Sequence, residues 1–170
     1  MHQFDKAVEY FNKSLVLAIQ LKDSSLVSYD YNNLGQAYNF AKNYKQALYY
    51  YTLSKSIKES LQDERGLGSA YGNISSVYFD TEQYDSALIY NKRAFDIRQK
   101  QHDKKGMATS YANVANIYLK QKNYTEALVN YENAIKLGEE IDFKEPIIES
   151  YNGLSNYYEI TGNTKEALRF

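Results

Sequence analysis

Several residue types are absent or rare in this chain of 170 residues, and each absence excludes a class of site. Because there is no cysteine, disulfides, thiolate metal sites and cysteine nucleophiles are excluded. The two histidines, His2 and His102, are too few for a histidine-rich metal site or a histidine-based catalytic triad. One proline and eight glycines are too few for a β-sandwich rich in turns.

Charge and hydropathy exclude two further classes of protein. Twenty basic and 21 acidic side chains give a formal net charge of −1, whereas a nucleic-acid-binding domain normally carries a basic excess. No apolar run approaches the ~20 residues that cross a bilayer. We therefore expect neither a nucleic-acid partner nor direct membrane insertion of this segment. The first residues lack the features of an export signal. The compartment is left undetermined, with the cytoplasm slightly favoured over a periplasmic location, which would need a signal peptide in the full-length protein.

The sequence contains no recognisable motif for catalysis or phosphate binding, since neither G-x-x-x-x-G-K-[ST] nor G-x-S-x-G occurs. Glu139 and Glu140 are adjacent, so their side chains diverge on a helix and form no catalytic pair. We interpret Lys104 and Lys105 as part of a solvated turn. His102 is predicted at the end of a helix, where a cation suits the dipole. We therefore expect a protein that is not an enzyme and has no cofactor or metal.

What the chain does contain is a repeat with a period of 40 residues, which accounts for most of its 19 tyrosines. Two aromatic columns contain Tyr31, Tyr71, Tyr111 and Tyr151, and then Tyr38, Tyr78, Tyr118 and Tyr158. An alanine column contains Ala7, Ala47, Ala87, Ala127 and Ala167. The column four residues later contains Phe11, Tyr51, Asn91 and Tyr131.

Within each repeat the apolar spacing is that of two helices. One stripe, at i, i+3, i+4 and i+7, contains Tyr31, Leu34, Gly35 and Tyr38. A second contains Ala47, Leu48, Tyr51 and Ser54. Three pairs have the spacing of capping boxes at the start of a helix: Asn43 with Gln46, Asn123 with Glu126, and Asn163 with Glu166. Each repeat is therefore predicted to be a helix–turn–helix.

These columns resemble the tetratricopeptide repeat, whose signature is W-x2-L-G-x2-Y…A-x3-F. The matching residues here are Tyr31, Leu34, Gly35, Tyr38, Ala47 and Tyr51, with tyrosine in place of tryptophan and phenylalanine. The period is longer than the usual 34 residues. In this it is similar to the repeats of kinesin light chain, Rap-type regulators and the sensory arrays of bacterial histidine kinases. The resemblance implies an all-α, right-handed superhelical solenoid of antiparallel helix pairs.

We expect a single array over residues 1–170. Its predicted parts are the second helix of a partial repeat at 1–26, full repeats at 27–66, 67–106 and 107–146, and a partial repeat at 147–170. Because both ends stop within a repeat, we interpret the chain as an excerpt of a longer protein. Apolar side chains at the ends should then be exposed and support end-to-end self-association: Val8, Leu15, Tyr151 and Leu154.

The candidate binding site is the face of the first helices that points away from the stack, which the resemblance places along a concave groove. The predicted peptide-binding residues are Tyr29, Asn33, Gln36, Asn73, Ser76, Asn113, Asn116, Asn152 and Asn156. A column of carboxamides offers both donors and acceptors to an extended peptide, as in the asparagine ladder of kinesin light chain. The alternative is that these asparagines bond to neighbouring helices or to water. Since these positions carry no Lys or Arg, a strongly anionic ligand is rejected.

The predicted function is a scaffold that binds a protein or peptide segment in this groove. The alternative is a regulatory or sensory segment of a bacterial signalling protein, such as a histidine kinase or a transcription regulator. The sequence that flanks this segment would distinguish the two.

Overall fold

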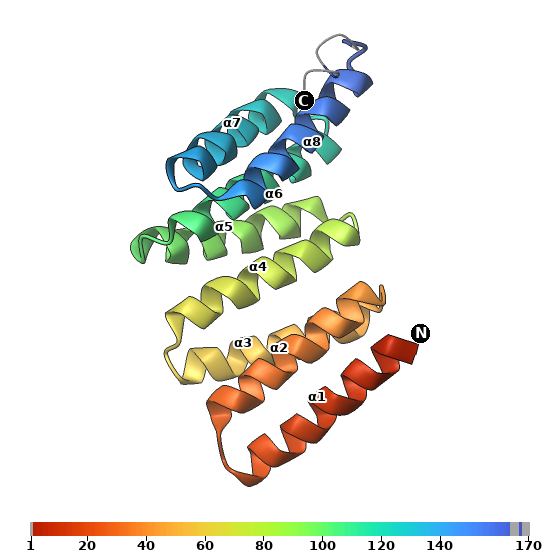
Figure 1. Cartoon of the computed structure of the whole chain (residues 1–170), viewed down its shortest axis with the longest axis vertical. Coiled ribbons are helices and arrows are strands. Elements are labelled where there is room, and N and C mark those ends of the chain that lie inside the picture. The colour runs from red at the N-terminus through yellow and green to blue at the C-terminus, as the bar shows by residue number, and fades with distance from the viewer. Residues whose placement is uncertain (1, 164–166, 168–170) are drawn as a thin grey trace. The chain divides into compact units, whose positions relative to one another are not determined.

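The computed structural model describes residues 2–163 and Ala167, and these residues form helices and no strand (Figure 1). The helices are α1 His2–Gln20, α2 Ser24–Phe40, α3 Tyr44–Ser60, α4 Glu64–Asp80, α5 Tyr84–Lys100, α6 Lys104–Lys120, α7 Tyr124–Glu140 and α8 Lys144–Ile160. We call α2, α4, α6 and α8 the first helices of the repeats, and α1, α3, α5 and α7 the second helices. The predicted all-α fold, built from helix pairs, is confirmed.

Short turns join successive helices, and each turn has one residue in the left-handed conformation. Their φ angles lie between 49° and 60° at Lys22, Lys42, Gln62, Glu82, His102, Lys122 and Asp142. In the first complete repeat, the Asn43 N–H donates to the Tyr38 carbonyl at 2.9 Å, and the Lys42 N–H donates to the Asn39 carbonyl, also at 2.9 Å. This pair of bonds is a Schellman motif, which satisfies the last carbonyls of a helix and reverses the chain.

The turn between α5 and α6 corrects two predictions. His102 has a φ of 54° and follows the end of α5 at Lys100, so it lies in the turn and not in the last turn of the helix. Lys104 is the first residue of α6 and not a loop residue, because Asp103 caps this helix by accepting a 3.0 Å bond from the Gly106 N–H.

The predicted capping boxes have different outcomes. The Asn43 side chain caps α3 by accepting a 3.3 Å bond from the Gln46 N–H, as predicted. The Asn123 side chain makes no capping bond to α7, so that prediction is wrong; this side chain is exposed, and water can satisfy it. The third box includes Glu166, which lies outside the described residues.

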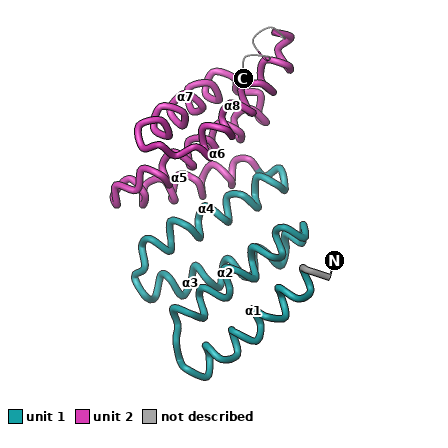
Figure 2. The backbone as a smooth tube through the Cα atoms, viewed as in Figure 1, with its two compact units in different colours: residues 1–83 teal, residues 84–170 magenta. Residues whose placement is uncertain are grey.

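The chain divides into two compact units, residues 1–83 and 84–170 (Figure 2). Unit 1 contains α1 to α4, in which each helix packs against the next. Its buried apolar side chains are Ala18, Leu34, Ala47, Tyr51, Ala70, Ile74 and Val77. A Cβ atom on Gly35 would lie 2.6 Å from Cδ1 of Tyr51, so the ring needs a glycine beneath it. Burial of this ring raises the pKa of Tyr51 to about 12.

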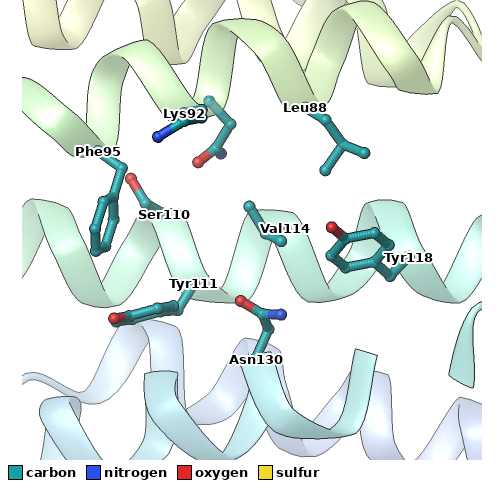
Figure 3. Close-up of a pocket in the computed structure, with 9 residues that line it drawn as sticks. Leu88, Lys92, Phe95, Ser110, Tyr111, Val114, Tyr118 and Asn130 are labelled. Carbon is teal, nitrogen blue, oxygen red and sulfur yellow. The ribbon is translucent and has the colours of Figure 1, made fainter. Parts of the chain in front are cut away.

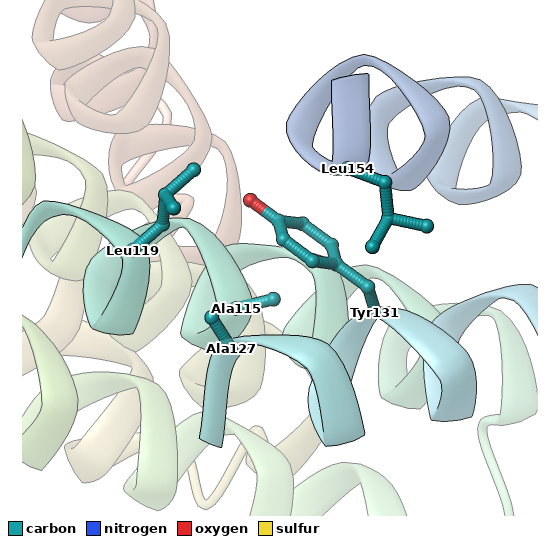
Figure 4. Close-up of a cluster of buried hydrophobic side chains, with 5 residues drawn as sticks. All are labelled: Ala115, Leu119, Ala127, Tyr131 and Leu154. Atoms are coloured by element: carbon teal, nitrogen blue, oxygen red, sulfur yellow. The ribbon is translucent and has the colours of Figure 1, made fainter. Parts of the chain in front are cut away.

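Unit 2 contains α5 to α8, and one cluster of buried side chains joins three of its helices. Figure 4 shows its members, Ala115, Leu119, Ala127, Tyr131 and Leu154. Leu154 is buried because it packs in this cluster, and Tyr151 is half-buried beside it. The prediction that these two side chains are exposed is therefore wrong.

The apolar surface of α1 also differs from the prediction. Val8 and Leu15 are half-buried, because α1 packs along α2. The exposed apolar side chains of α1 are instead Tyr10, Val16, Leu17 and Ile19, and Leu21 in the turn that follows is also exposed.

The first helices α2, α4, α6 and α8 begin at residues 24, 64, 104 and 144, three residues before the predicted repeat boundaries. The predicted repeat 67–106 includes most of α4, in unit 1, and all of α5, in unit 2. The division into units therefore falls within a repeat, at the turn between its two helices.

Candidate functional site

The structure places all nine predicted site residues on the first helices. Each unit contributes two of these helices: α2 and α4 pack together in unit 1, and α6 and α8 pack together in unit 2. The exposed members of the set are Tyr29, Gln36, Ser76, Asn152 and Asn156. The half-buried members are Asn33, Asn73, Asn113 and Asn116. The predicted asparagine column is therefore divided, with Asn33 and Asn73 in unit 1 and Asn113 in unit 2.

In unit 1, one asparagine of the column ties the two first helices together. Nδ2 of Asn73 on α4 donates to Oδ1 of Asn32 on α2 at 2.8 Å. Asn33 and Gln36 make no side-chain hydrogen bond to any other described residue, so their carboxamides are available to a ligand. Two adjacent asparagines on α2 therefore differ, because Asn32 bonds to a helix whereas Asn33 keeps its donors and acceptor.

The α2–α4 face, which we define as Tyr29, Asn33, Gln36, Ser69, Asn73 and Ser76, carries no charged side chain. Four of these residues are exposed, and the ring of Tyr29 is 60% exposed. An exposed helix face without Lys or Glu is unusual, since these residues favour both helix and solubility. The face combines carboxamides and hydroxyls with one large ring, which suits a neutral polar chain.

In unit 2, a second asparagine of the predicted set belongs to a hydrogen-bonded network. Nδ2 of Asn116 donates to Oε1 of Glu149 at 2.7 Å, and Oδ1 of Asn116 accepts from the Tyr131 hydroxyl at 2.6 Å. These bonds join α6, α7 and α8. Burial raises the pKa of the Glu149 carboxyl, and the bond from Asn116 opposes this rise. Burial also raises the pKa of the Tyr131 hydroxyl, and the nearby charge of Glu149 adds to the effect.

The remaining predicted residues of unit 2 are Asn113, Asn152 and Asn156. None of them makes a side-chain hydrogen bond to another residue in the part of the chain that the structure describes. Asn32 and Tyr131, which bond to two of the predicted asparagines, are not among the predicted site residues. Asn32 belongs to no column of the repeat that predicts binding, and Tyr131 has the spacing of an ordinary core aromatic.

The described residues include no group of three or more His, Asp or Glu side chains that could hold a metal ion. Over the same residues, no helix is both long and apolar enough to cross a membrane.

A comparison with known families identifies these repeats. A family model described as the tetratricopeptide repeat matches residues 1–60, 32–100 and 106–170. The chain belongs to the tetratricopeptide-repeat family. Its repeats support a role as a protein-interaction scaffold, and this fold is typically a non-catalytic one.

Solved structures share the fold at low sequence identity. BtubC (BKLC) from P. vanneervenii is 19% identical with a TM-score of 0.81, and the match covers 98% of this chain and 70% of that one. Aspartyl phosphate phosphatase F from Bacillus subtilis is 16% identical with a TM-score of 0.87, and the match covers 99% of this chain but 46% of that one. A putative kinesin light chain of Podosopora anserina with nearly identical TPR-like repeats is 16% identical with a TM-score of 0.74. That match covers 99% of this chain and 83% of the other. No curated protein sequence matches the chain.

Proposed function

We propose that this chain is a non-catalytic scaffold that binds an extended, uncharged segment of a partner protein along its first helices. The observation that carries the proposal is the α2–α4 face of unit 1, which has no charge and includes free carboxamides at Asn33 and Gln36. The bond between Asn73 and Asn32 fixes the two helices of this face to each other, so the face is ordered before a ligand arrives.

The chemistry of this face suits a peptide backbone. A carboxamide donates and accepts at once, so the Asn33 and Gln36 side chains can each bond to the N–H and C=O groups of an extended chain. The exposed Tyr29 ring offers apolar area for one side chain of the ligand, as tyrosine does in many interfaces. Because no charge is present, affinity should depend little on ionic strength.

Unit 2 offers a smaller set of free groups for a second stretch of the partner. Asn152 and Asn156 lie one turn apart on α8 and are exposed, and Asn113 on α6 is half-buried. Asn116 is already bonded to Glu149 and Tyr131, so we assign it to the support of this face and not to direct contact with a ligand.

A regulatory segment of a signalling protein is the second function to consider. The chain spans 46% of aspartyl phosphate phosphatase F, but likeness at 16% identity extends to the fold alone. No contact in the described residues favours this function over a binding scaffold, so we retain the scaffold.

The proposal is tested by selecting peptides from a random display library against the intact chain. The bound position of the best peptide is then mapped by amide chemical-shift changes in NMR. We expect the largest changes at the outward residues of α2 and α4. Changes confined to α1 and α3 would contradict the proposal and would place the binding site on the second helices.

A further inference from the structure

Unit 2 contains a cavity of about 290 Å³ bounded by α5, α6 and α7, and none of the proposed peptide-binding residues lines it. Its apolar wall consists of Leu88, Phe95, Tyr111, Val114 and Tyr118. Figure 3 shows Asn130 reaching from α7 toward Val114, between the rings of Tyr111 and Tyr118. The volume is near the lower limit for ligand pockets, about 300 Å³, and is about twice that of a cavity of ~150 Å³ that holds benzene, so a single ring fits inside it.

The wall of this cavity also contains a buried carboxamide without a partner. Asn91 on α5 is fully buried, and neither its Nδ2 nor its Oδ1 has a hydrogen-bond partner in the structure described. Leaving such a group unpaired destabilises a fold, so the orphan amide of a residue that lines a cavity needs an explanation. Two other polar groups of the wall are already bonded: the Ser110 hydroxyl accepts from Arg98 Nη1 at 2.6 Å, and Asn130 Nδ2 donates to the Glu126 carbonyl at 2.8 Å.

The corresponding place in unit 1 is filled by a tyrosine ring. Tyr50 lies with its ring 6.0 Å from that of Tyr31 and stacked at 5.4 Å on that of Tyr38. Eighty residues later, two periods along the repeat, Tyr31 and Tyr38 correspond to Tyr111 and Tyr118, while Tyr50 corresponds to Asn130. The two flanking rings are therefore kept in unit 2, and the ring between them is missing.

A second ring is replaced at the same place. Asn91 occupies the column in which Phe11, two periods earlier, contributes an aromatic ring. Phe11 and Tyr50 are thus both exchanged for asparagine around one cavity. These two exchanges account for its volume and for the unpaired amide together.

We propose that this cavity binds the phenol ring of a tyrosine from a partner protein, inserted between Tyr111 and Tyr118. The ring takes the place that Tyr50 fills in unit 1. Its hydroxyl bonds to the Asn91 amide, which is covered in the unliganded chain and turns toward the cavity as the ring enters. Tyrosine fits better than phenylalanine because a phenol hydroxyl donates and accepts, as the carboxamide does. This site is independent of the first-helix faces and goes beyond the function proposed above.

The probes for the test are p-cresol, which is the tyrosine side chain alone, and toluene, which has the same shape without the hydroxyl. Binding to the intact chain is measured by ligand-observed NMR. We expect p-cresol to bind about fivefold more tightly than toluene, the ratio that one net hydrogen bond supplies. Absence of p-cresol binding up to its solubility, with water alone bonded to Asn91 in a crystal structure, would overturn the proposal.

Two variants locate the binding. Asn130→Tyr restores the ring of the Tyr50 column and should weaken p-cresol at least tenfold, because the cavity is then filled. Asn91→Leu should abolish the preference for p-cresol over toluene while toluene still binds. Unchanged p-cresol affinity in Asn130→Tyr, with helicity intact by circular dichroism, would overturn the assignment of the cavity.

A third variant keeps the test decisive if Asn130→Tyr does not fold. Tyr50→Asn removes the corresponding ring in unit 1 and should create a second site, in which toluene and p-cresol bind equally because Phe11 replaces Asn91 there.

The source of the ring is tested with acetyl-Gly-Tyr-Gly-amide and its phenylalanine analogue. We expect the tyrosyl peptide to bind at least as tightly as p-cresol and more tightly than the analogue. If p-cresol binds and neither peptide does, the proposal that the ring belongs to a partner protein would be overturned, and the occupant would be a free small molecule.

Discussion

The Tyr131 hydroxyl donates a 2.6 Å hydrogen bond to Oδ1 of Asn116, and this bond joins α7 to α6. The other end of the same carboxamide donates to Glu149 on α8 at 2.7 Å. Beside it, a Cβ atom on Gly153 would lie 2.2 Å from the Tyr131 hydroxyl oxygen, so the ring fits only over a glycine. One asparagine and one tyrosine thus fix the positions of three helices.

Removal of the Tyr131 hydroxyl tests the value of this network. Tyr131→Phe keeps the buried ring but leaves Oδ1 of Asn116 without its donor. We expect the free energy of unfolding to fall by about 1 kcal/mol, as for one lost hydrogen bond. Chemical denaturation measures this change, and Tyr29→Phe on the exposed surface is the matched control, which should have no effect. Equal stability of both variants would mean that the hydroxyl contributes nothing to the fold.

The raised pKa of Glu149 predicts a pH dependence of stability. Below the ordinary value of 4.5 the carboxyl is neutral in both the folded and the unfolded chain, so its favourable contribution is fully present. As pH rises through the higher pKa of the folded state, ionisation of the half-buried group lowers the stability. The variant Glu149→Gln keeps an acceptor for Asn116 and lacks this ionisation.

We therefore expect Glu149→Gln to gain thermal stability relative to the parent chain between about pH 4.5 and neutral pH. Thermal unfolding followed by circular dichroism across this range measures the difference. Glu132→Gln, an exposed position on α7, is the control. A constant difference between Glu149→Gln and the parent at every pH would contradict the prediction.

The alanine column predicts which substitutions the fold tolerates. Ala87 on α5 is fully buried, so Ala87→Arg would both overpack the site and bury a charge. We expect a loss of about 3 kcal/mol or more, visible as a large fall in the thermal midpoint. Lys92→Ala should cost at most about 0.5 kcal/mol, because this side chain is 76% exposed and its pair with Asp96 is a surface one. Equal midpoints for the two variants would mean that the repeat register is wrong.

The exposed face of α1 predicts self-association. Val16, Leu17 and Ile19 are each more than half exposed, and Leu21 is 74% exposed. At the positions of Val16 and Ile19, the later second helices carry polar or charged residues: Ser56, Asp96, Lys136, Glu59, Gln99 and Glu139. Apolar residues at these two positions are therefore particular to α1, and contiguous apolar surface of this kind tends to pair.

We propose that chains associate through this face, and sedimentation velocity over a range of concentrations tests it. The parent should form larger species as concentration rises. The variant Val16→Asp, Ile19→Glu uses residues that other repeats already have at these positions, and it should remain a monomer. A parent chain that stays monomeric throughout, or a variant that associates equally, would rule out this face.

Much of the fold was predictable because the information lies in local spacing. The columns at Tyr31 and Ala47 recur every 40 residues, and they identified both helices of each repeat and the family. The turns were less predictable, because the left-handed position is occupied by ordinary residues such as Lys42 and His102 instead of glycine. Which residue adopts the left-handed conformation and ends a helix depends on backbone hydrogen bonds, and the residue type does not indicate these.

The candidate site was predictable as a face but not residue by residue. Asn33 and Asn73 occupy the same column, yet Asn73 bonds to a residue 41 positions away and Asn33 does not. The partner of a carboxamide depends on its rotamer and on the adjacent helix, neither of which the spacing specifies. The exchange at Asn91 was visible in the sequence as a break in the aromatic column, but its unpaired state follows only from packing.

Binding by the α2–α4 face is tested most directly by titrating a selected peptide against the variant Asn33→Ala, Gln36→Ala. These residues are chosen because Asn73→Ala would also break the bond to Asn32. The matched control is Asn123→Ala, Gln99→Ala, which removes the same two residue types from exposed positions outside the first helices.

At about 1 kcal/mol for each lost hydrogen bond, the affinity of the first variant should fall roughly tenfold to a hundredfold. Helicity should be kept, since alanine favours helix. The fall should be the same at low and high ionic strength, and the control should bind like the parent. Unchanged affinity in the first variant, or an equal loss in the control, would contradict peptide binding by the first helices.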